Sequence, residues 1–209
     1  MRGKIIISYP GSKSEIIEYI VNNLDYSKEC FIDLFGGSGS VILNKKPHKV
    51  DIYNDINEDL YALFYSLHFH YDEFMEKIEN LFACEKFFYS LRDMDTSKMS
   101  IVEKGVRAFY LYSLSFMGFS YTFAYGYNEN LTKKFFSKKQ LLKELKEKFK
   151  HITVLNKDYR EILELIKNKT NIMLYADPPY FGAEYMYRGI NFTKEDHETL
   201  AKYLNDAKY

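Results

Sequence analysis

The sequence has no tryptophan, only two cysteines and four prolines, and no net charge. Its 29 basic residues balance 29 acidic ones, so only a local patch can indicate a polyanionic partner. No stretch approaches the roughly 20 apolar residues of a membrane span, and the N-terminus lacks the pattern of a signal peptide. We therefore expect a cytoplasmic protein without a membrane partner.

Cysteine and histidine are too sparse to indicate a metal centre. Cys30 and Cys84 lack the spacing of a metal-binding pair. A disulfide between them stays open, but reduced thiols are favoured and fit a cytoplasmic setting. His68 and His70 are two residues apart, which places them on different sides of a helix. We expect no metal site.

A short apolar segment near the end of the chain precedes the first candidate functional residues. Ile172 to Ala176 predicts a short buried strand, and Asp177, Pro178, Pro179 and Tyr180 follow it. Ligands bind beyond the carboxyl ends of strands in open α/β sheets. We therefore predict that these four residues are catalytic.

Their chemistry suits a planar group that carries an amine, such as adenine. The Asp177 carboxylate and the Pro178 carbonyl are acceptors in a stiff turn, and Tyr180 offers a flat face for stacking. Hydrogen bonds from the adenine amine to these acceptors would localise its lone pair and make it a better nucleophile. The alternative is a proline-rich turn after a core strand.

A glycine-rich turn lies near the start of the chain. Phe31 to Leu34 predicts a strand, Gly36, Gly37 and Gly39 make a tight turn, and a helix begins near Ser40. The spacing differs from the dinucleotide-binding fingerprint. Asp33 would repel a pyrophosphate but would accept the amino group of a ligand. The methionine part of S-adenosylmethionine (AdoMet) meets that requirement.

Two further segments are candidates for the same site. Asn54 and Asp55 end the predicted strand that starts at Lys49, where an acid is positioned to bind ribose hydroxyls; an Asx turn or helix cap is a compatible alternative. The turn from Tyr9 to Lys13 precedes a predicted helix that Ser12 or Ser14 caps, and such a turn can hold an anion. The alternative there is a plain loop with a solvated lysine.

The middle of the chain is predicted to be mostly helical, over Leu60 to about Leu91, Ile101 to about Phe116 and Lys138 to Phe149. An aromatic loop or hairpin runs from Phe116 to Asn130, and Leu131 to Lys150 holds eight lysines against two glutamates. Aromatic residues beside a basic run suit nucleic-acid contact. A solvated lysine face is the alternative.

The last part of the chain predicts a strand that ends at Asp158, a short helix over Arg160 to Lys167, and a helix capped by Thr193.

The order of these motifs resembles the Dam-like N6-adenine DNA methyltransferases. The turn from Tyr9 to Lys13 is similar to the family's Gly-Gly-Lys motif for AdoMet, with Ser12 in place of the second glycine. The resemblance extends to four further motifs: the AdoMet loop Asp33 to Gly39, the ribose-binding Tyr53 to Asn57, the adenine-contacting Asn156 to Tyr159, and the catalytic Asp177 to Tyr180. Phe192 to Leu200 is similar to the helix that follows them.

The resemblance implies an α/β fold with a Rossmann-like AdoMet-dependent methyltransferase sheet. Residues 1–60 and 151–209 would form the catalytic domain, and residues 61–150 an inserted, mostly helical target-recognition domain. The final strands of the family's sheet are expected to be missing, so we expect a truncated chain.

The resemblance also implies the site residues. The expected cofactor-binding residues are Tyr9, Pro10, Gly11, Lys13, Asp33, Leu34, Phe35, Gly36, Gly37, Ser38, Gly39, Ser40, Asn54, Asp55, Asp158 and Tyr159. From the aromatic stretch and the lysine-rich run themselves, the expected DNA-binding residues are Tyr121, Tyr125, Tyr127, Asn128, Lys133, Lys134 and Lys138.

The implied function is transfer of a methyl group from AdoMet to the N6 amine of adenine in a short sequence of double-stranded DNA. We expect a monomer or weak dimer, and a restriction endonuclease partner stays open. The alternatives are methylation of an RNA base amine, or an inactive or truncated nucleic-acid-binding relative.

Overall fold

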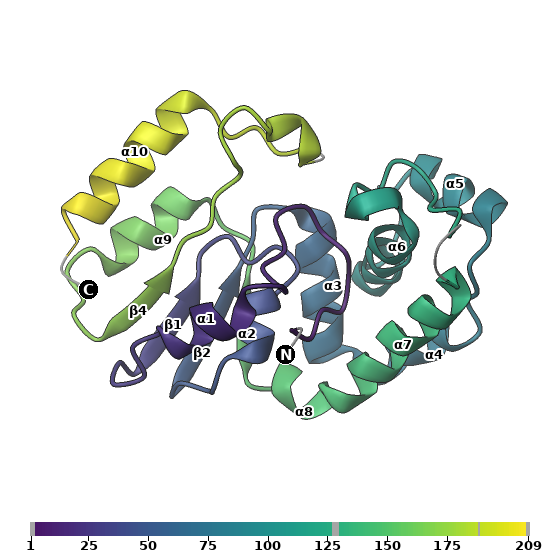
Figure 1. The fold of residues 1–209 in the computed structure, drawn as a ribbon, viewed down its shortest axis with the longest axis horizontal. Coiled ribbons are helices and arrows are strands. Elements are labelled where there is room, and N and C mark those ends of the chain that lie inside the picture. Colours follow the sequence, from purple (N-terminus) through teal and green to yellow (C-terminus); the bar gives the residue numbers. More distant parts are fainter. Residues whose placement is uncertain (1–2, 127–129, 188, 208–209) are drawn as a thin grey trace.

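In the described part of the chain, four short parallel strands form one sheet. The structure is a computed structural model that describes residues 3–126, 130–187 and 189–207. The strand order is β3-β2-β1-β4. The strands are β1 (Cys30–Asp33), β2 (Val50–Asn54), β3 (Ile152–Leu155) and β4 (Ile172–Tyr175). This mixed α/β arrangement confirms the predicted fold class, and Figure 1 shows the sheet beside a group of helices.

Both faces of the sheet are covered, as parallel sheets require. Alternating residues of β1 point to opposite faces: Phe31 joins one buried cluster with Phe64, whereas Ile32 joins a second cluster with Leu163. The helices that flank the sheet include α1 (Ile17–Asn22), α2 (Ser40–Asn44), α3 (Glu58–Phe69), α9 (Tyr159–Ile166) and α10 (Lys194–Asn205). Figure 1 shows α9 and α10 on the side away from α3.

The chain between β2 and β3 is helical. Its elements are α3 (Glu58–Phe69), α4 (Tyr71–Glu79), α5 (Glu85–Asp93), α6 (Ile101–Leu114), the 3-10 turn η1 (Phe116–Gly118), α7 (Leu131–Glu144) and α8 (Lys146–Phe149). A second 3-10 turn, η2 (Glu184–Met186), lies in the loop after β4. The buried cluster on one sheet face continues through α3 into α6 and α7, so apolar packing joins the helical insert to the sheet. The division into two domains stays a prediction.

Several predicted boundaries are wrong. The helix expected over Leu60 to Leu91 is three helices, because the chain turns at His70 and again over residues 80–84. Ile16 stands at the start of α1 and makes no side-chain capping bond, so neither predicted serine caps it. The helix expected from Lys138 begins at Leu131, where the side chain of Asn130 accepts a hydrogen bond from a backbone N–H.

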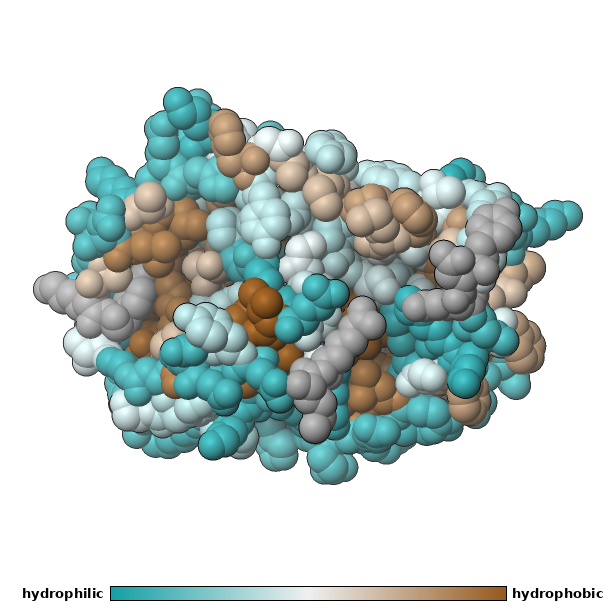
Figure 2. Space-filling view, viewed as in Figure 1, coloured by the Kyte–Doolittle hydropathy of each residue, from teal (hydrophilic) through white to brown (hydrophobic). Residues whose placement is uncertain are grey.

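Within the described part of the chain, no helix is long and apolar enough to cross a membrane. Figure 2 shows one face of the molecule, largely hydrophilic and interrupted by separate hydrophobic patches.

Candidate active site

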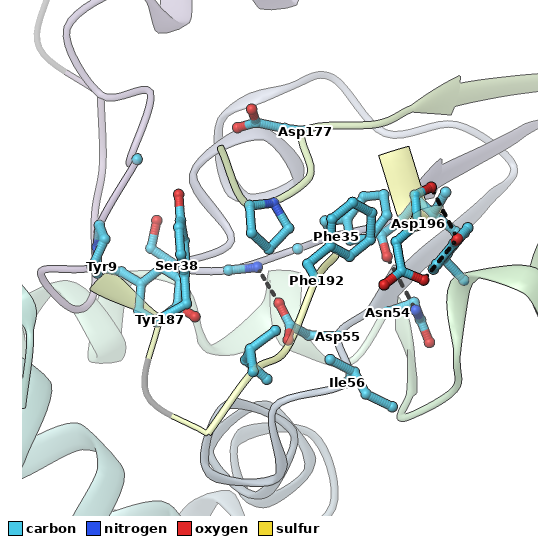
Figure 3. A pocket seen from close by; sticks show the side chains of 18 of the residues that line it. Tyr9, Phe35, Ser38, Asn54, Asp55, Ile56, Asp177, Tyr187, Phe192 and Asp196 are labelled. Carbon is cyan, nitrogen blue, oxygen red and sulfur yellow. Dashed lines mark hydrogen bonds between the residues drawn. The ribbon is translucent and has the colours of Figure 1, made fainter. Parts of the chain in front are cut away.

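A cavity of about 310 Å³ lies at the carboxyl ends of the four strands. Its walls come from the segments that follow each strand, which is where ligands bind in open α/β sheets. Figure 3 shows Tyr9, Ser38 and Tyr187 at one end, and Phe35, Phe192 and Asp196 at the other, with Asp55 between them.

The glycine-rich turn between β1 and α2 forms one wall, and its shape requires glycine. Gly37 and Gly39 adopt left-handed backbone conformations, with φ of 53° and 70°. A side chain at Gly36 would overlap the buried Tyr53 ring, and one at Gly39 would overlap the Phe64 ring. The turn therefore brings backbone to the cavity where any larger residue would clash.

Asp55 lies in the middle of the cavity and is held by backbone donors. Its two oxygens accept hydrogen bonds from Asn57 N at 2.8 Å and Gly37 N at 2.7 Å. Burial raises the pKa of Asp55 to about 6, although both bonds oppose the shift. The Asx turn given as the alternative is therefore present, and it fixes the carboxylate beside the glycine-rich turn.

Asp177 follows β4 and pairs with the lysine of the N-terminal turn. Lys13 Nζ contacts the Asp177 carboxylate and donates to Tyr180 Oη at 2.6 Å and to the Gly11 carbonyl at 2.8 Å. Burial opposes the charge on Lys13, but its bonds to Asp177 and Tyr180 prevail and raise its pKa. Segments far apart in sequence thus meet in an ion pair between Lys13 and Asp177 that also contacts the Tyr180 hydroxyl.

Asp33, the acid at the end of β1, is 1% exposed, and its Oδ2 has no hydrogen-bond partner among the described residues. Burial, together with the carboxylates of Asp177 and Asp55, raises the pKa of Asp33 to about 8. Asp33 directly precedes two residues that line the cavity but does not line it itself. Its contact with a cofactor amino group stays a prediction.

Three aromatic rings form the far end of the cavity. Phe35, Tyr159 and Phe192 pack on one another with ring centroids 5.4 to 5.6 Å apart. Asp158 caps α9 and accepts from the backbone N–H of Arg160 at 2.8 Å. This end offers flat apolar surfaces with a carboxylate at the edge, which suits a purine ring.

Most of the predicted site residues line this one cavity. They are Tyr9, Pro10, Gly11, Leu34, Phe35, Gly36, Gly37, Ser38, Ser40, Asn54, Asp55, Asp158, Tyr159, Asp177 and Pro179. The predicted residues outside the lining are Lys13, Asp33, Gly39, Pro178 and Tyr180.

Among the described residues, sequence reasoning missed ten that also line the cavity. They are Ser12, Ile56, Lys157, Arg160, Tyr187, Gly189, Ile190, Asn191, Phe192 and Asp196. Phe192 and Asp196 lie in the segment that resembles the family's next helix. The sequence therefore indicated where they lie in the fold, but not that they line the cavity. No pattern pointed to Tyr187, which reaches the cavity from the loop after β4.

The predicted DNA-contacting residues separate into exposed and buried ones. Tyr121 and Tyr125 are exposed by 40% and 56%, and Lys133 and Lys134 are also exposed. Tyr127 and Asn128 lie outside the described residues.

Lys138 corrects the prediction, because it is 5% exposed and donates to Ser8 Oγ at 3.0 Å. Burial lowers the pKa of Lys138 to about 7. The helix turns this lysine toward the protein interior, so we no longer include it among the residues expected to contact DNA.

Among the residues that the structure describes, no group of three or more histidine, cysteine, aspartate or glutamate side chains could hold a metal ion.

Comparison with known proteins identifies the family. Residues 9–209 match the D12 class N6 adenine-specific DNA methyltransferases. The chain belongs to this family. It is also 26% identical over 187 residues to a DNA adenine methylase of Serratia marcescens, an alignment that covers 86% of this chain and 67% of that protein. Methyltransferases of this family depend on AdoMet, and nothing in the comparisons favours an RNA substrate or an inactive relative.

Proposed function

We propose that this chain binds AdoMet in the cavity at the carboxyl ends of the strands and methylates the N6 amine of adenine in DNA. One observation carries the proposal: Asp177 lines the same cavity as the glycine-rich turn and Asp55. The acceptor for the target amine and the candidate cofactor site are therefore adjacent.

The cavity residues fit AdoMet. Asp55 presents a carboxylate for ribose hydroxyls, and the three aromatic rings suit the adenine. A side chain at Gly11 would approach Tyr187 Oη at 3.1 Å, and one at Gly37 would approach the Tyr9 ring at 3.3 Å, so larger residues would fill the space between these walls. The buried Asp33 carboxyl, whose Oδ2 has no hydrogen-bond partner among the described residues, lies next to this cradle.

The residues around Asp177 hold the target amine. AdoMet, when bound, supplies an electrophilic methyl group on a sulfonium sulfur. The Asp177 carboxylate and the Pro178 carbonyl accept hydrogen bonds from the adenine amine, which localises the N6 lone pair toward the methyl donor. Lys13 pairs with Asp177 and so balances its charge, and Tyr180, 44% exposed, offers its ring to the base.

The target base has to leave the DNA stack to reach this site. Enzymes that modify a base extrude it from the duplex at a cost of a few kcal/mol, and aromatic stacking recovers part of that cost. The protein then contributes position and electrostatics rather than covalent chemistry. The exposed aromatic and basic residues of the insert are proposed to hold the duplex while the base is extruded.

Replacement of Asp177 separates chemistry from cofactor binding. We expect Asp177→Ala to lower the methylation rate by roughly a hundredfold or more, because it removes the acceptor that activates the amine. Binding of S-adenosylhomocysteine (AdoHcy), measured by calorimetry, should stay close to that of the unmodified protein. Asp72→Ala removes a carboxylate whose side chain is 88% exposed on α4 and should leave both measurements unchanged. Methylation by Asp177→Ala at the unmodified rate would refute this role.

A further inference from the structure

Arg160, near the start of α9, joins two carboxylates that flank the aromatic end of the cavity. Its Nη1 lies 3.2 and 3.0 Å from the two oxygens of Asp158, and its Nη2 contacts the Asp196 carboxylate. The guanidinium carbon lies 4.6 Å from the centre of the Tyr159 ring. Asp158 follows β3, whereas Asp196 lies in α10, so Arg160 links two separate segments of the chain.

Asp196 fixes the start of α10. Its Oδ2 accepts from Thr193 N at 2.7 Å and Thr193 Oγ1 at 2.9 Å, in a reciprocal capping arrangement. Tyr159 Oη donates to the Asp196 carbonyl at 3.1 Å. The residue immediately before this cap is Phe192, so anything that holds Asp196 also sets the position of the Phe192 ring.

Phe192 closes the aromatic end of the cavity. It is 5% exposed and packs against Phe35 and Tyr159, the two rings that project from the segments after β1 and β3. Figure 3 shows Phe35 and Phe192 together beside Asp196. The width of this end is therefore set by how closely α10 is held to α9.

Of the two contacts that Arg160 makes with carboxylates, the one with Asp196 contributes more. Arg160 and Asp158 are 44% and 41% exposed, and ion pairs so open to solvent contribute little. The Asp196 side chain is 10% exposed and also accepts hydrogen bonds from Thr193 and from Tyr159 Oη, so the carboxylate end of its contact with Arg160 is largely shielded from water.

We infer that Arg160 is a positioning residue, which binds Asp158 and Asp196 together so that Phe35, Tyr159 and Phe192 close on the adenine ring of the cofactor. The inference rests on the proposed AdoMet site. Arg160 acts through the two carboxylates and the Phe192 ring, and it stands apart from the Asp177 end where the amine is held. Its loss should therefore weaken adenosine binding and leave the chemical step intact.

Two ligands separate the adenine end from the methionine end. AdoHcy spans both, whereas 5′-methylthioadenosine keeps the adenosine and lacks the amino acid. By calorimetry, Arg160→Ala should weaken both ligands by the same factor, roughly tenfold, because a charge-assisted contact is lost. The KM for AdoMet should rise with kcat unchanged. Arg160→Lys can pair with only one carboxylate at a time and should weaken both ligands less.

A double-mutant cycle tests whether Arg160 acts through Asp196. Asp196→Asn should weaken both ligands as well, and Arg160→Ala with Asp196→Asn should bind no more weakly than the poorer single variant, because both changes break one link. Lys167→Ala removes an exposed pair with Glu164 at the other end of α9 and should bind like the unmodified protein.

Several results would overturn the inference. The inference is wrong if Arg160→Ala binds both ligands as tightly as the unmodified protein, or if it weakens the binding of AdoHcy alone. It is also wrong if Lys167→Ala weakens ligand binding as much as Arg160→Ala does. If Arg160→Ala does not fold, Arg160→Lys and Asp196→Asn serve as the test instead. The inference is then wrong if both variants bind both ligands as tightly as the unmodified protein does. If the unmodified protein binds neither ligand, the proposed cofactor site fails and the inference with it.

Discussion

At the scale of single residues, titration of Asp55 should make cofactor binding in the cavity depend on pH. Burial raises its pKa to about 6, so the carboxylate is ionised at pH 7 and becomes protonated as the pH falls below 6. The protonated form is a poorer acceptor for ribose hydroxyls. AdoHcy affinity should therefore decline between pH 7 and pH 5, as measured by calorimetry at each pH.

The variant Asp55→Asn isolates this titration. It should bind AdoHcy roughly tenfold to a hundredfold more weakly at pH 7, the cost of losing hydrogen bonds to a charged acceptor. Its affinity should no longer decline between pH 7 and pH 5. The same decline in the variant would assign the pH dependence to another group.

The sequence predicted the positions of individual site residues better than their burial and their contacts. The residue types of Asp177 and Asp55 and their positions after strands were sufficient to place both at the cavity. The sequence did not show which side chains are buried. Lys138 lies in a lysine-rich run, yet its side chain points inward and contacts Ser8. Lys13 was expected at the cofactor, and its contact with Asp177 depends on a meeting of distant segments that local sequence does not encode.

At the scale of elements, the turn between β1 and α2 depends on glycine at Gly39. Alanine there would adopt a left-handed conformation at φ 70° and overlap the buried Phe64 ring. Gly39→Ala should lower the free energy of unfolding by about 2–5 kcal/mol, because backbone strain and overpacking add. Urea denaturation measures this change.

Gly182→Ala is the matched control for that change. Gly182 also has a positive φ, 80°, but no described residue would lie within 4 Å of an added Cβ. Gly182→Ala should therefore lower the free energy of unfolding only through backbone strain, by about 1–2 kcal/mol. Equal losses in the two variants would show that contact with Phe64 does not matter.

Elements were predicted well where one pattern dominated. The four strands are short apolar runs that end in polar residues, and each was found close to its expected place. Helix breaks were missed because Leu60, Leu63 and Leu67 continue an apolar period up to His70, and the chain then starts α4 with a new apolar face at Phe74. Neither His70 nor the second break at residues 80–84 contains a glycine or proline to signal the end of a helix.

At the scale of the whole molecule, DNA is proposed to lie across the insert as well as the catalytic cavity. Net charge is zero, so binding depends on local lysines such as the exposed Lys133 and Lys134 at the start of α7. Each lysine that contacts a phosphate contributes about one to the slope of log affinity against log salt. Lys133→Ala and Lys134→Ala should each lower that slope by about one in fluorescence anisotropy titrations.

Lys146→Ala provides the comparison for these two variants. Lys146 lies in α8, outside the residues expected to contact DNA, so its removal should leave the salt dependence unchanged. A slope that is equal in all three variants and the unmodified protein would place the DNA elsewhere on the surface.

The identity of the methylated nucleoside tests the central claim most directly. The unmodified protein is incubated with unmethylated double-stranded DNA and AdoMet carrying a labelled methyl group, and the DNA is then digested and its nucleosides separated. The account predicts label in N6-methyladenine alone. Label in a different nucleoside, or no transfer by a protein that still binds AdoHcy, would contradict it.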